Sequence, residues 1–266
     1  MNSDERPEAG HHVGRYMGVA MREVEELHLV GHASVAPHLR GPAGGVRTGA
    51  LLTMLDNVGG VTGGLAALPD GWVVSTNLAA RVVARSHVGP LRIDSCLLRR
   101  GRNNVVTSVQ VRDEGLRDAL VASGVLTSAI LVPENGPPQW TRPLVLEAGP
   151  EPAPDLPSMP DWLGVRVVGD HAVEIELAAE LRNPWGILHG GVVATLVDLA
   201  AEHATGGGIT TDVVLHFLAP NRVGPVRASV RELGRRTDGR LLRVEVRDEG
   251  AARMTALAIV TCAPRA

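Results

Sequence analysis

The chain contains one segment twice, and this internal repeat constrains its fold more than any other feature. Residues 36–56 align without gaps to residues 178–198, with eight identities in 21 positions. These two segments are 142 positions apart. Further on, the correspondence resumes at a separation of 135 positions, in two pairs of segments: Val88-Gly89-Pro90 with Val223-Gly224-Pro225, and 111–115 with 246–250. Solenoid repeats are only ~20 to 50 residues long, so a repeat of this length predicts a duplicated domain. Two domains of about 120 residues each fit the usual size of a domain.

We place the first domain at 14–132 and the second at 161–266. Between them, residues 133–160 hold nine of the chain's 18 prolines and show no hydrophobic period. This composition is typical of an extended connector, long enough to let the two domains pair side by side. The change of shift indicates seven extra residues in the first copy, which we expect in a longer loop around 68–72.

The second copy shows the order of elements within a domain. Alternating residues over 165–178 predict strands, and a mainly apolar stretch over 191–204 predicts a buried helix that ends at Gly206. Four strand candidates follow, at 210–218, 225–233, 241–249 and 253–262. One buried helix followed by a run of strands predicts an α+β fold in which an antiparallel sheet wraps around the helix.

The composition indicates which binding partners and which cellular compartment to expect. Net charge is -3, and the basic residues are arginines spread along the chain, so a nucleic-acid partner is not indicated. We find no signal peptide and no segment of membrane-spanning length, which favours a cytoplasmic protein. Cys96 and Cys262 are the only cysteines, too few for a disulfide framework or a Cys-rich metal site, and we expect both to be small buried hydrophobes. We expect no metal and no cofactor.

The loop from Asn183 to Gly191 places polar groups and two glycines at the start of the second-copy helix. The first N–H groups of a helix have no partner inside it, so the Gly190 N–H can form an oxyanion site that the helix dipole reinforces. Asn183 could add a donor or orient a water molecule. His189 could hold the loop or help to polarise a substrate oxygen.

Asp198 follows Gly190 by eight residues, which separates them by about 12 Å along a helix. An attacking group and an oxyanion donor must both lie within roughly 3 Å of one reacting carbonyl, so another helix has to supply the carboxylate. Asp56 occupies the matching place in the first copy. If the copies pair antiparallel, Asp56 meets the start of the Gly190 helix, and Asp198 meets the start of the Thr48 helix.

Plainer explanations exist for each residue. Asp198 could belong to an exposed helical stripe with Thr195 and Glu202, although its recurrence as Asp56 weakens that reading. His189 could be only a capping residue of the loop, and the pair Gly190-Gly191 could serve only to turn the chain into the helix.

The segment N-P-W-G-I-L-H-G-G-V-V-A-T-L-V-D at 183–198 resembles the signature of hotdog-fold acyl-CoA thioesterases of the phenylacetate-pathway (PaaI-like) family. The resemblance covers most of 161–266 and, more weakly, 14–132. It implies two tandem hotdog domains, each a long central helix wrapped by an antiparallel sheet, paired as an intramolecular pseudo-dimer. Family members pair sheets edge to edge and place active sites between the two units, where the Asn, His and Gly of one unit face the Asp of the other.

Carried over by position, the resemblance implies one complete site that draws on both copies. It consists of five residues: Asn183, His189 and Gly190 with Asp56 and Ser75. The second pocket has Gly41, Arg47 and Thr48 where the motif has Asn, His and Gly, so we expect it to be degenerate although Asp198 and Thr210 are present. We expect Arg47 to pair with Asp198 there and neutralise it. Gly191, Trp185 and Arg222 are the candidate substrate-binding residues, with Arg222 offered for a coenzyme A phosphate.

The expected activity is hydrolysis of an acyl-CoA thioester, with coenzyme A entering as part of the substrate. Asp56 would act as general base on water or attack the carbonyl directly, and the sequence leaves both open. A non-catalytic acyl-CoA binding protein and a hotdog hydratase or dehydratase are the alternatives. The acyl group and any assembly beyond the internal pair are not predicted, although oligomers of the chain are possible.

Overall fold

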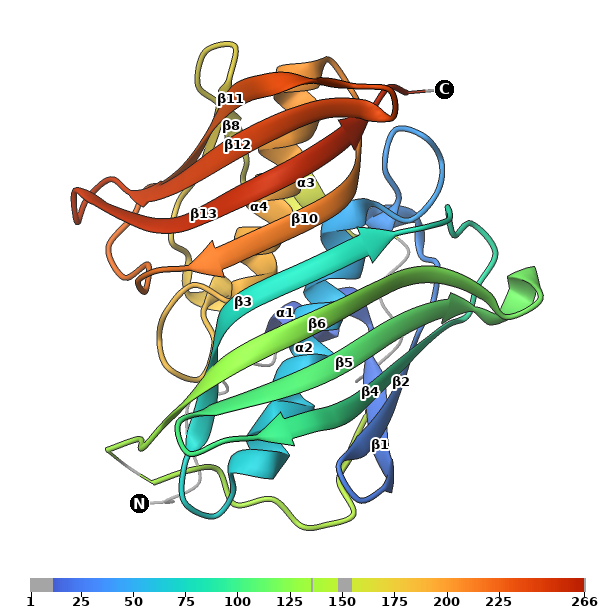
Figure 1. The fold of residues 1–266 in the computed structure, drawn as a ribbon, viewed down its shortest axis with the longest axis vertical. Coiled ribbons are helices and arrows are strands. Elements are labelled where there is room, and N and C mark those ends of the chain that lie inside the picture. Colours follow the sequence, from blue (N-terminus) through green and yellow to red (C-terminus); the bar gives the residue numbers. More distant parts are fainter. Residues whose placement is uncertain (1–11, 135, 148–154, 266) are drawn as a thin grey trace.

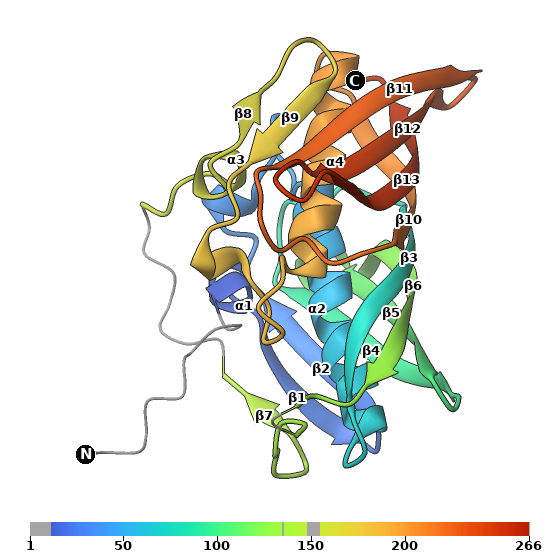
Figure 2. The same ribbon diagram turned by 90° about the vertical axis from the view of Figure 1, so that its left-hand side faces the viewer.

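The computed structural model describes residues 12–134, 136–147 and 155–265. Its two long helices lie on one side of a single curved antiparallel sheet (Figure 1; Figure 2). The first half of the chain forms these elements: α1 (His12–Met17), β1 (Ala20–Glu25), β2 (His28–Ala33), α2 (Thr48–Ala67), β3 (Trp72–Val82), β4 (Leu91–Arg100), β5 (Asn104–Asp113) and β6 (Ala119–Leu131). The second half forms these: β7 (Val145–Leu146), α3 (Met159–Trp162), β8 (Arg166–Val167), β9 (Ala172–Ile175), α4 (Gly190–Thr205), β10 (Ile209–Phe217), β11 (Val226–Arg236), β12 (Gly239–Asp248) and β13 (Arg253–Ala263). Among the described residues, three short 3₁₀ helices connect these elements: Pro37–Leu39, Glu114–Leu116 and Ala179–Leu181.

The sheet has 13 strands in the order β7-β1-β2-β4-β5-β6-β3-β10-β13-β12-β11-β9-β8. Its middle is the antiparallel pair β3 and β10, which runs from Asp212 opposite Arg81 to His216 opposite Asn77. Side chains reinforce this junction, because Arg81 forms an ion pair with Asp212 at 2.5 Å and the Asn77 amide donates to the Leu215 carbonyl. Strands that contact α2 therefore adjoin strands that contact α4 in one hydrogen-bonded sheet.

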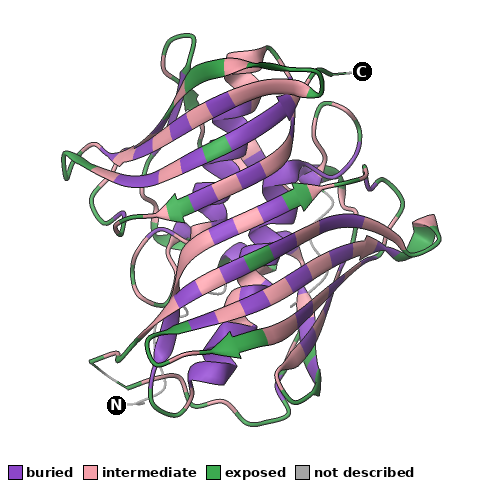
Figure 3. Cartoon of the chain, in the orientation of Figure 1, coloured by how far each residue is buried: buried purple, intermediate pink, exposed green. Residues whose placement is uncertain are grey.

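Burial follows the side of the sheet on which the helices lie (Figure 3). Most of α2 and the first three turns of α4 are buried, and alternate residues of β5 and β12 face them. One continuous cluster of buried apolar residues extends from Val13 to Cys262, so the two halves share a core.

The helix and strands predicted for 190–263 are confirmed, with ends shifted by at most three residues. The strands predicted for 165–178 are two short ones, β8 and β9, and the chain turns between them. The seven extra residues of the first copy are not all loop, because α2 has 20 residues and α4 has 16.

Two further expectations need correction. The described part of the connector 133–160 includes β7, which pairs with β1, and Arg142, whose guanidinium bonds the Glu23 carboxylate, so part of it packs on the first half. Cys262 is buried, but Cys96 is only half-buried. The alternation of β4 explains this, because Cys96 points away from the face that buries Ile93 and Ser95.

Candidate active site

The first turns of α2 and α4 cross in antiparallel directions, and small residues allow them to approach closely. A Cβ on Gly191 would lie 2.8 Å from Thr53 Cα, and one on Gly49 would lie 3.0 Å from Thr195 Cα. The Thr53 and Thr195 hydroxyls are 2.9 Å apart, and each lies within hydrogen-bond distance of the Gly49 carbonyl oxygen, which accepts from them. This crossing brings the middle of each helix beside the start of the other.

Asp56 of α2 therefore lies beside the start of α4. Its side chain is buried, and the Ser75 hydroxyl, from β3, donates to Asp56 Oδ1 at 2.6 Å. A Cβ on Gly190 would lie 2.8 Å from both oxygens of this carboxylate. Only glycine leaves room for the carboxylate here, and the hydrogen bond from Ser75 holds it against the helix end.

The Gly190 N–H has no hydrogen-bond acceptor within the described residues. It is the first amide of α4, whose positive dipole end strengthens binding of a negatively charged oxygen. An oxyanion donor and a carboxylate thus lie side by side, which is what attack on a carbonyl requires.

His189, the residue before α4, caps the helix. Its Nδ1 accepts from the Gly191 N–H at 3.0 Å and lies 3.4 Å from Asp56 Oδ2. Since the Nδ1 lone pair is occupied by an N–H donor, the neutral ring carries its proton on Nε2 and forms no hydrogen bond to Asp56. Burial lowers the pKa of His189, opposed by the charge of Asp56, in agreement with a neutral ring.

The loop before His189 is held by two of the predicted residues. Asn183 Oδ1 accepts from the backbone N–H groups of Trp185 and Ile187, so this side chain shapes the loop. The Trp185 indole donates to the Val73 carbonyl of β3 at 3.0 Å. Trp185 therefore ties the loop of the second half to the strand that carries Ser75.

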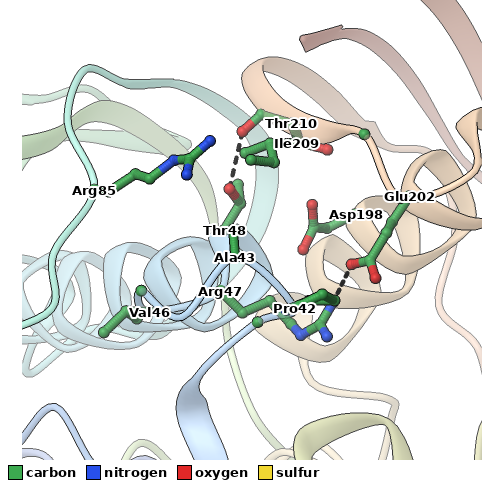
Figure 4. A pocket seen from close by; sticks show the side chains of 14 residues that line it. Pro42, Ala43, Val46, Arg47, Thr48, Arg85, Asp198, Glu202, Ile209 and Thr210 are labelled. Carbon is green, nitrogen blue, oxygen red and sulfur yellow. Dashed lines mark hydrogen bonds and ion pairs between the residues drawn. The ribbon is translucent and has the colours of Figure 1, made fainter. Parts of the chain in front are cut away.

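The pocket at the start of α2 contains the second set of predicted residues (Figure 4). Here Asp198 Oδ2 accepts from the Gly49 N–H at 2.8 Å, and the Thr48 hydroxyl donates to the Thr210 carbonyl. Burial raises the pKa of Asp198, opposed by the charge of Arg47. Asp198 is thus used as a helix cap, whereas Asp56 is not.

The expected ion pair between Arg47 and Asp198 is wrong. Arg47 pairs with Glu202, one turn further along α4, as the dashed line in Figure 4 marks. The Gly49 amide needs an acceptor, and the Arg47 side chain has none to offer. Asp198 accepts from this amide instead, and Arg47 pairs with the next carboxylate along α4. Asp198 and Thr195 are buried, so the explanation of an exposed stripe is also wrong.

Sequence reasoning missed several residues of these two sites. Thr53 and Thr195 set the helix crossing, and their identity at matching places in the repeat was an available signal. Glu202 and Arg85, which line the second pocket, gave no such signal. Arg222 is exposed, and its backbone N–H donates to the Asp248 carboxylate, whereas its guanidinium has no partner among the residues that the structure describes. The described residues contain no group of three or more His, Cys, Asp or Glu side chains that could hold a metal ion.

The comparisons agree with this architecture. Residues 180–262 match the family model described as acyl-CoA thioesterase N-terminal domain, and a search of curated proteins finds no match. The 12:0-ACP thioesterase from Umbellularia californica is similar in structure, with a TM-score of 0.64, 10% identity, and coverage of 90% of this chain and 94% of that one. An acyl-ACP thioesterase from Bacteroides thetaiotaomicron has a TM-score of 0.60 at 14% identity, covering 89% and 98% of the two chains.

A third similar structure is the tesB protein of Mycobacterium avium subsp. paratuberculosis, with a TM-score of 0.58, 14% identity, and coverage of 92% of this chain and 96% of that one. At such identities the likeness shows the fold alone. No helix among the described residues is long and apolar enough to cross a membrane. The chain has a hotdog-like α+β fold, and the match of 180–262 to an acyl-CoA thioesterase domain supports a thioester hydrolase.

Proposed function

We propose that the chain is a tandem pair of hotdog units, 14–132 and 161–266, joined by the connector 133–160 and assembled as an intramolecular pseudo-dimer. The repeat of 36–56 in 178–198 supports this organisation. The antiparallel junction of β3 with β10 and the antiparallel crossing of α2 with α4 agree with pairing about a pseudo-twofold axis.

Within that pair, we propose that the chain hydrolyses acyl-CoA thioesters in the manner of the PaaI-like family, with a single complete site. One observation carries this proposal: the buried Asp56 carboxylate lies against Gly190, at the start of a helix from the other half of the chain. No other part of the site joins an attacking group and an oxyanion donor so directly.

In this mechanism the Gly190 N–H hydrogen-bonds the thioester carbonyl and stabilises the negative charge that develops on its oxygen. Asp56 either takes a proton from the attacking water or attacks the carbonyl carbon itself. The C–S bond then breaks, and coenzyme A leaves as a thiolate that takes up a proton. Ser75 holds the carboxylate in place, and His189 caps the helix so that Asp56 need not.

The remaining predicted residues take supporting roles. Asn183 and Trp185 hold the loop, and Gly191 permits the helix crossing. Arg222 would contact a coenzyme A phosphate at the protein surface. No metal or separate cofactor enters these steps.

The test is thiol release from a panel of acyl-CoA thioesters, ranging from acetyl to lauroyl and including aryl-acyl thioesters. We expect Asp56→Asn to lower kcat by at least about a hundredfold, the usual contribution of a positioned base, whereas Asp198→Asn keeps most of the activity. The reverse order would contradict the assignment of the site. Tight binding of acyl-CoA without thiol release would favour a binding protein, and an enoyl product would favour a hydratase or dehydratase.

A single turnover in H₂¹⁸O, followed by mass spectrometry of the Asp56 side chain, tests direct attack. If Asp56 attacks the carbonyl, a mixed anhydride forms, and water that opens it at the Asp56 carboxyl carbon leaves ¹⁸O in the side chain. If Asp56 only activates water, the Asp56 side chain stays unlabelled and ¹⁸O appears in the carboxylic acid product; water that opens the anhydride at its acyl carbon gives the same product label, so trapping the anhydride with hydroxylamine distinguishes the two.

A further inference from the structure

Helix α2 leaves an open space directly beyond Asp56, at Gly60. These two residues lie one turn apart on the same face of the helix, about 6 Å along its axis. Apart from the neighbouring backbone of α2, a Cβ on Gly60 would meet no atom within 4 Å. Gly60 is only half-buried, whereas Asp56 before it and residues 62–67 after it are buried. The space is therefore a gap in the packing around α2, and it begins at the carboxylate of the proposed active site.

The Trp72 indole closes this space one turn further along the helix. Its ring lies flush against Gly64, where an added Cβ would overlap the ring atoms. Trp72 is itself buried, and Trp140 packs on it edge to face with ring centroids 4.7 Å apart. At Gly63 a Cβ would lie 3.7 Å from Val105 Cγ1, so the space there admits a methyl group and little more. The space thus narrows and ends at an aromatic wall.

Strand β3 and the loop before α4 border the same space. The Val73 side chain would lie 3.8 Å from a Cβ on Gly63, and the Val73 carbonyl accepts from the Trp185 indole. Two residues further along β3, the Ser75 hydroxyl donates to Asp56. Beyond the carboxylate, these walls present a valine side chain and indole rings. Apolar walls that lead away from a single polar group suit a hydrocarbon chain attached to a reacting carbonyl.

The matching position in the other half carries a charged side chain. Glu202 follows Asp198 by four residues, as Gly60 follows Asp56. Its carboxylate pairs with Arg47, as Figure 4 shows, so charged groups lie one turn beyond Asp198. Of the two helix starts, only the one with Asp56 therefore has an open, apolar space one turn beyond its carboxylate.

We propose that the space over Gly60 binds the acyl chain of the substrate and that Trp72 limits its length, an inference that rests on the proposed thioester hydrolysis. With the thioester carbonyl at the Gly190 N–H, the chain extends past Gly60 toward Trp72. Gly64 lies about 12 Å beyond Asp56 along the helix axis. Because an extended chain advances about 1.3 Å per carbon, and the ring has its own thickness, this length holds an unbranched acyl chain of roughly six to eight carbons.

Rates of thiol release from acetyl-CoA to lauroyl-CoA test this proposal. We expect kcat/KM of the wild type to rise from acetyl-CoA to octanoyl-CoA and to fall for lauroyl-CoA. Gly60→Leu fills the space, and it should lower kcat/KM for octanoyl-CoA at least about tenfold, because each buried methylene group contributes roughly fourfold to binding. Hydrolysis of acetyl-CoA should be unchanged, since its methyl group does not extend as far as Gly60.

Gly234→Leu is the matched control, because a Cβ on Gly234 of β11 also meets nothing within 4 Å. It should keep the chain-length preference of the wild type. Trp72→Leu shortens the aromatic wall and should raise kcat/KM for lauroyl-CoA relative to octanoyl-CoA, with urea unfolding to verify that the variant is folded. An unchanged ratio of octanoyl-CoA to acetyl-CoA hydrolysis in Gly60→Leu would overturn the proposal, whatever Trp72→Leu does.

Binding measurements separate the acyl site from the proposed hydrolysis. In Asp56→Asn, isothermal titration calorimetry should show tighter binding of octanoyl-CoA than of acetyl-CoA, and the further change Gly60→Leu should remove this difference. If the wild type releases no thiol but the difference is present, the proposed hydrolysis is contradicted and the acyl site is supported. Equal affinity for the two thioesters in Asp56→Asn would overturn the acyl site, even in a chain that hydrolyses both.

Discussion

His189 and Arg47 are the residues directly before the two long helices, and they leave the helix starts in different states. His189 accepts from the second amide of its helix, so Asp56 remains free to bond Ser75. Arg47 has no acceptor, and Asp198 bonds the corresponding amide of Gly49 instead. The residue before each helix thus differs together with the bonding of the facing carboxylate: Asp198 accepts from a helix amide, and Asp56 does not.

Gly190→Ala tests the close approach of Asp56 to the helix start. The added Cβ would lie 2.8 Å from both carboxylate oxygens, which are the mobile end of a side chain, so Asp56 should rotate away from Ser75. We expect a loss of thioester hydrolysis of at least about tenfold, with stability nearly unchanged because alanine favours a helix. Thiol release and urea unfolding measure the two effects. A fully active variant would show that Asp56 does not need this position.

His189→Asn tests the neutral histidine cap by its dependence on pH. Burial lowers the pKa of His189 below its ordinary 6.5. As pH falls, this side chain therefore binds a proton in the unfolded chain before it does so in the folded chain. The folded state loses stability as pH falls from about 6.5 through the lower pKa. Asparagine can accept from Gly191 but does not titrate. We expect urea unfolding at pH 5.5 and 7.5 to differ less in this variant than in the wild type.

The exposed His171 provides the control for that measurement. His171→Asn should leave the difference between pH 5.5 and 7.5 as it is in the wild type. An unchanged difference in His189→Asn would show that the ring binds protons equally in the folded and unfolded chains.

At the scale of elements, the crossing of α2 and α4 sets the geometry of both pockets. Gly49 and Gly191 let the backbone of each helix contact a threonine of the other helix. The two threonine hydroxyls are hydrogen-bonded to each other at this contact. Because the crossing is antiparallel, it fixes both Asp56 and Asp198 beside a helix start. The crossing therefore acts as the common support of two pockets that differ in their residues.

Gly191→Ala should separate the helices. Its Cβ would lie 2.8 Å from Thr53 Cα, a backbone atom that cannot rotate away, so we expect a loss of about 1 to 3 kcal/mol in the free energy of unfolding. Gly60→Ala, also within a long helix, meets nothing within 4 Å and should stabilise the chain by about 0.5 to 1 kcal/mol. Urea unfolding compares the two, and equal effects would show that the crossing tolerates wider spacing.

At the scale of the whole molecule, the two halves share one sheet and one apolar core. The sheet continues through β3 and β10, and the buried cluster includes residues of both halves. A site made of Asp56 and Ser75 from one half and Gly190 from the other depends on this union. Each half alone presents only part of the proposed catalytic groups.

We therefore expect the chain to unfold in one cooperative transition and not as two independent domains. Leu242→Ala removes a buried side chain from β12 and should destabilise the chain by about 2 to 5 kcal/mol. Native-state hydrogen exchange should then accelerate in β5 as well as in β12, because opening either half exposes the shared core. Acceleration confined to β12 would show that the halves unfold separately.

The sequence by itself determined the order of the helices and strands, and it indicated that the proposed site needs residues from both copies. The repeat can be read by comparing two segments of the sequence, and the periodicity of 191–204 and the alternation of the later strands depend only on neighbouring residues. The separation of eight positions from Gly190 to Asp198 excludes a site on one helix. Packing between distant segments decided the rest. Whether Arg47 pairs with Asp198 or Glu202, and whether Asp198 caps the Gly49 amide, depends on contacts between residues more than 100 positions apart. No local pattern encodes such contacts, because they result from how closely two helices can approach once their side chains are packed.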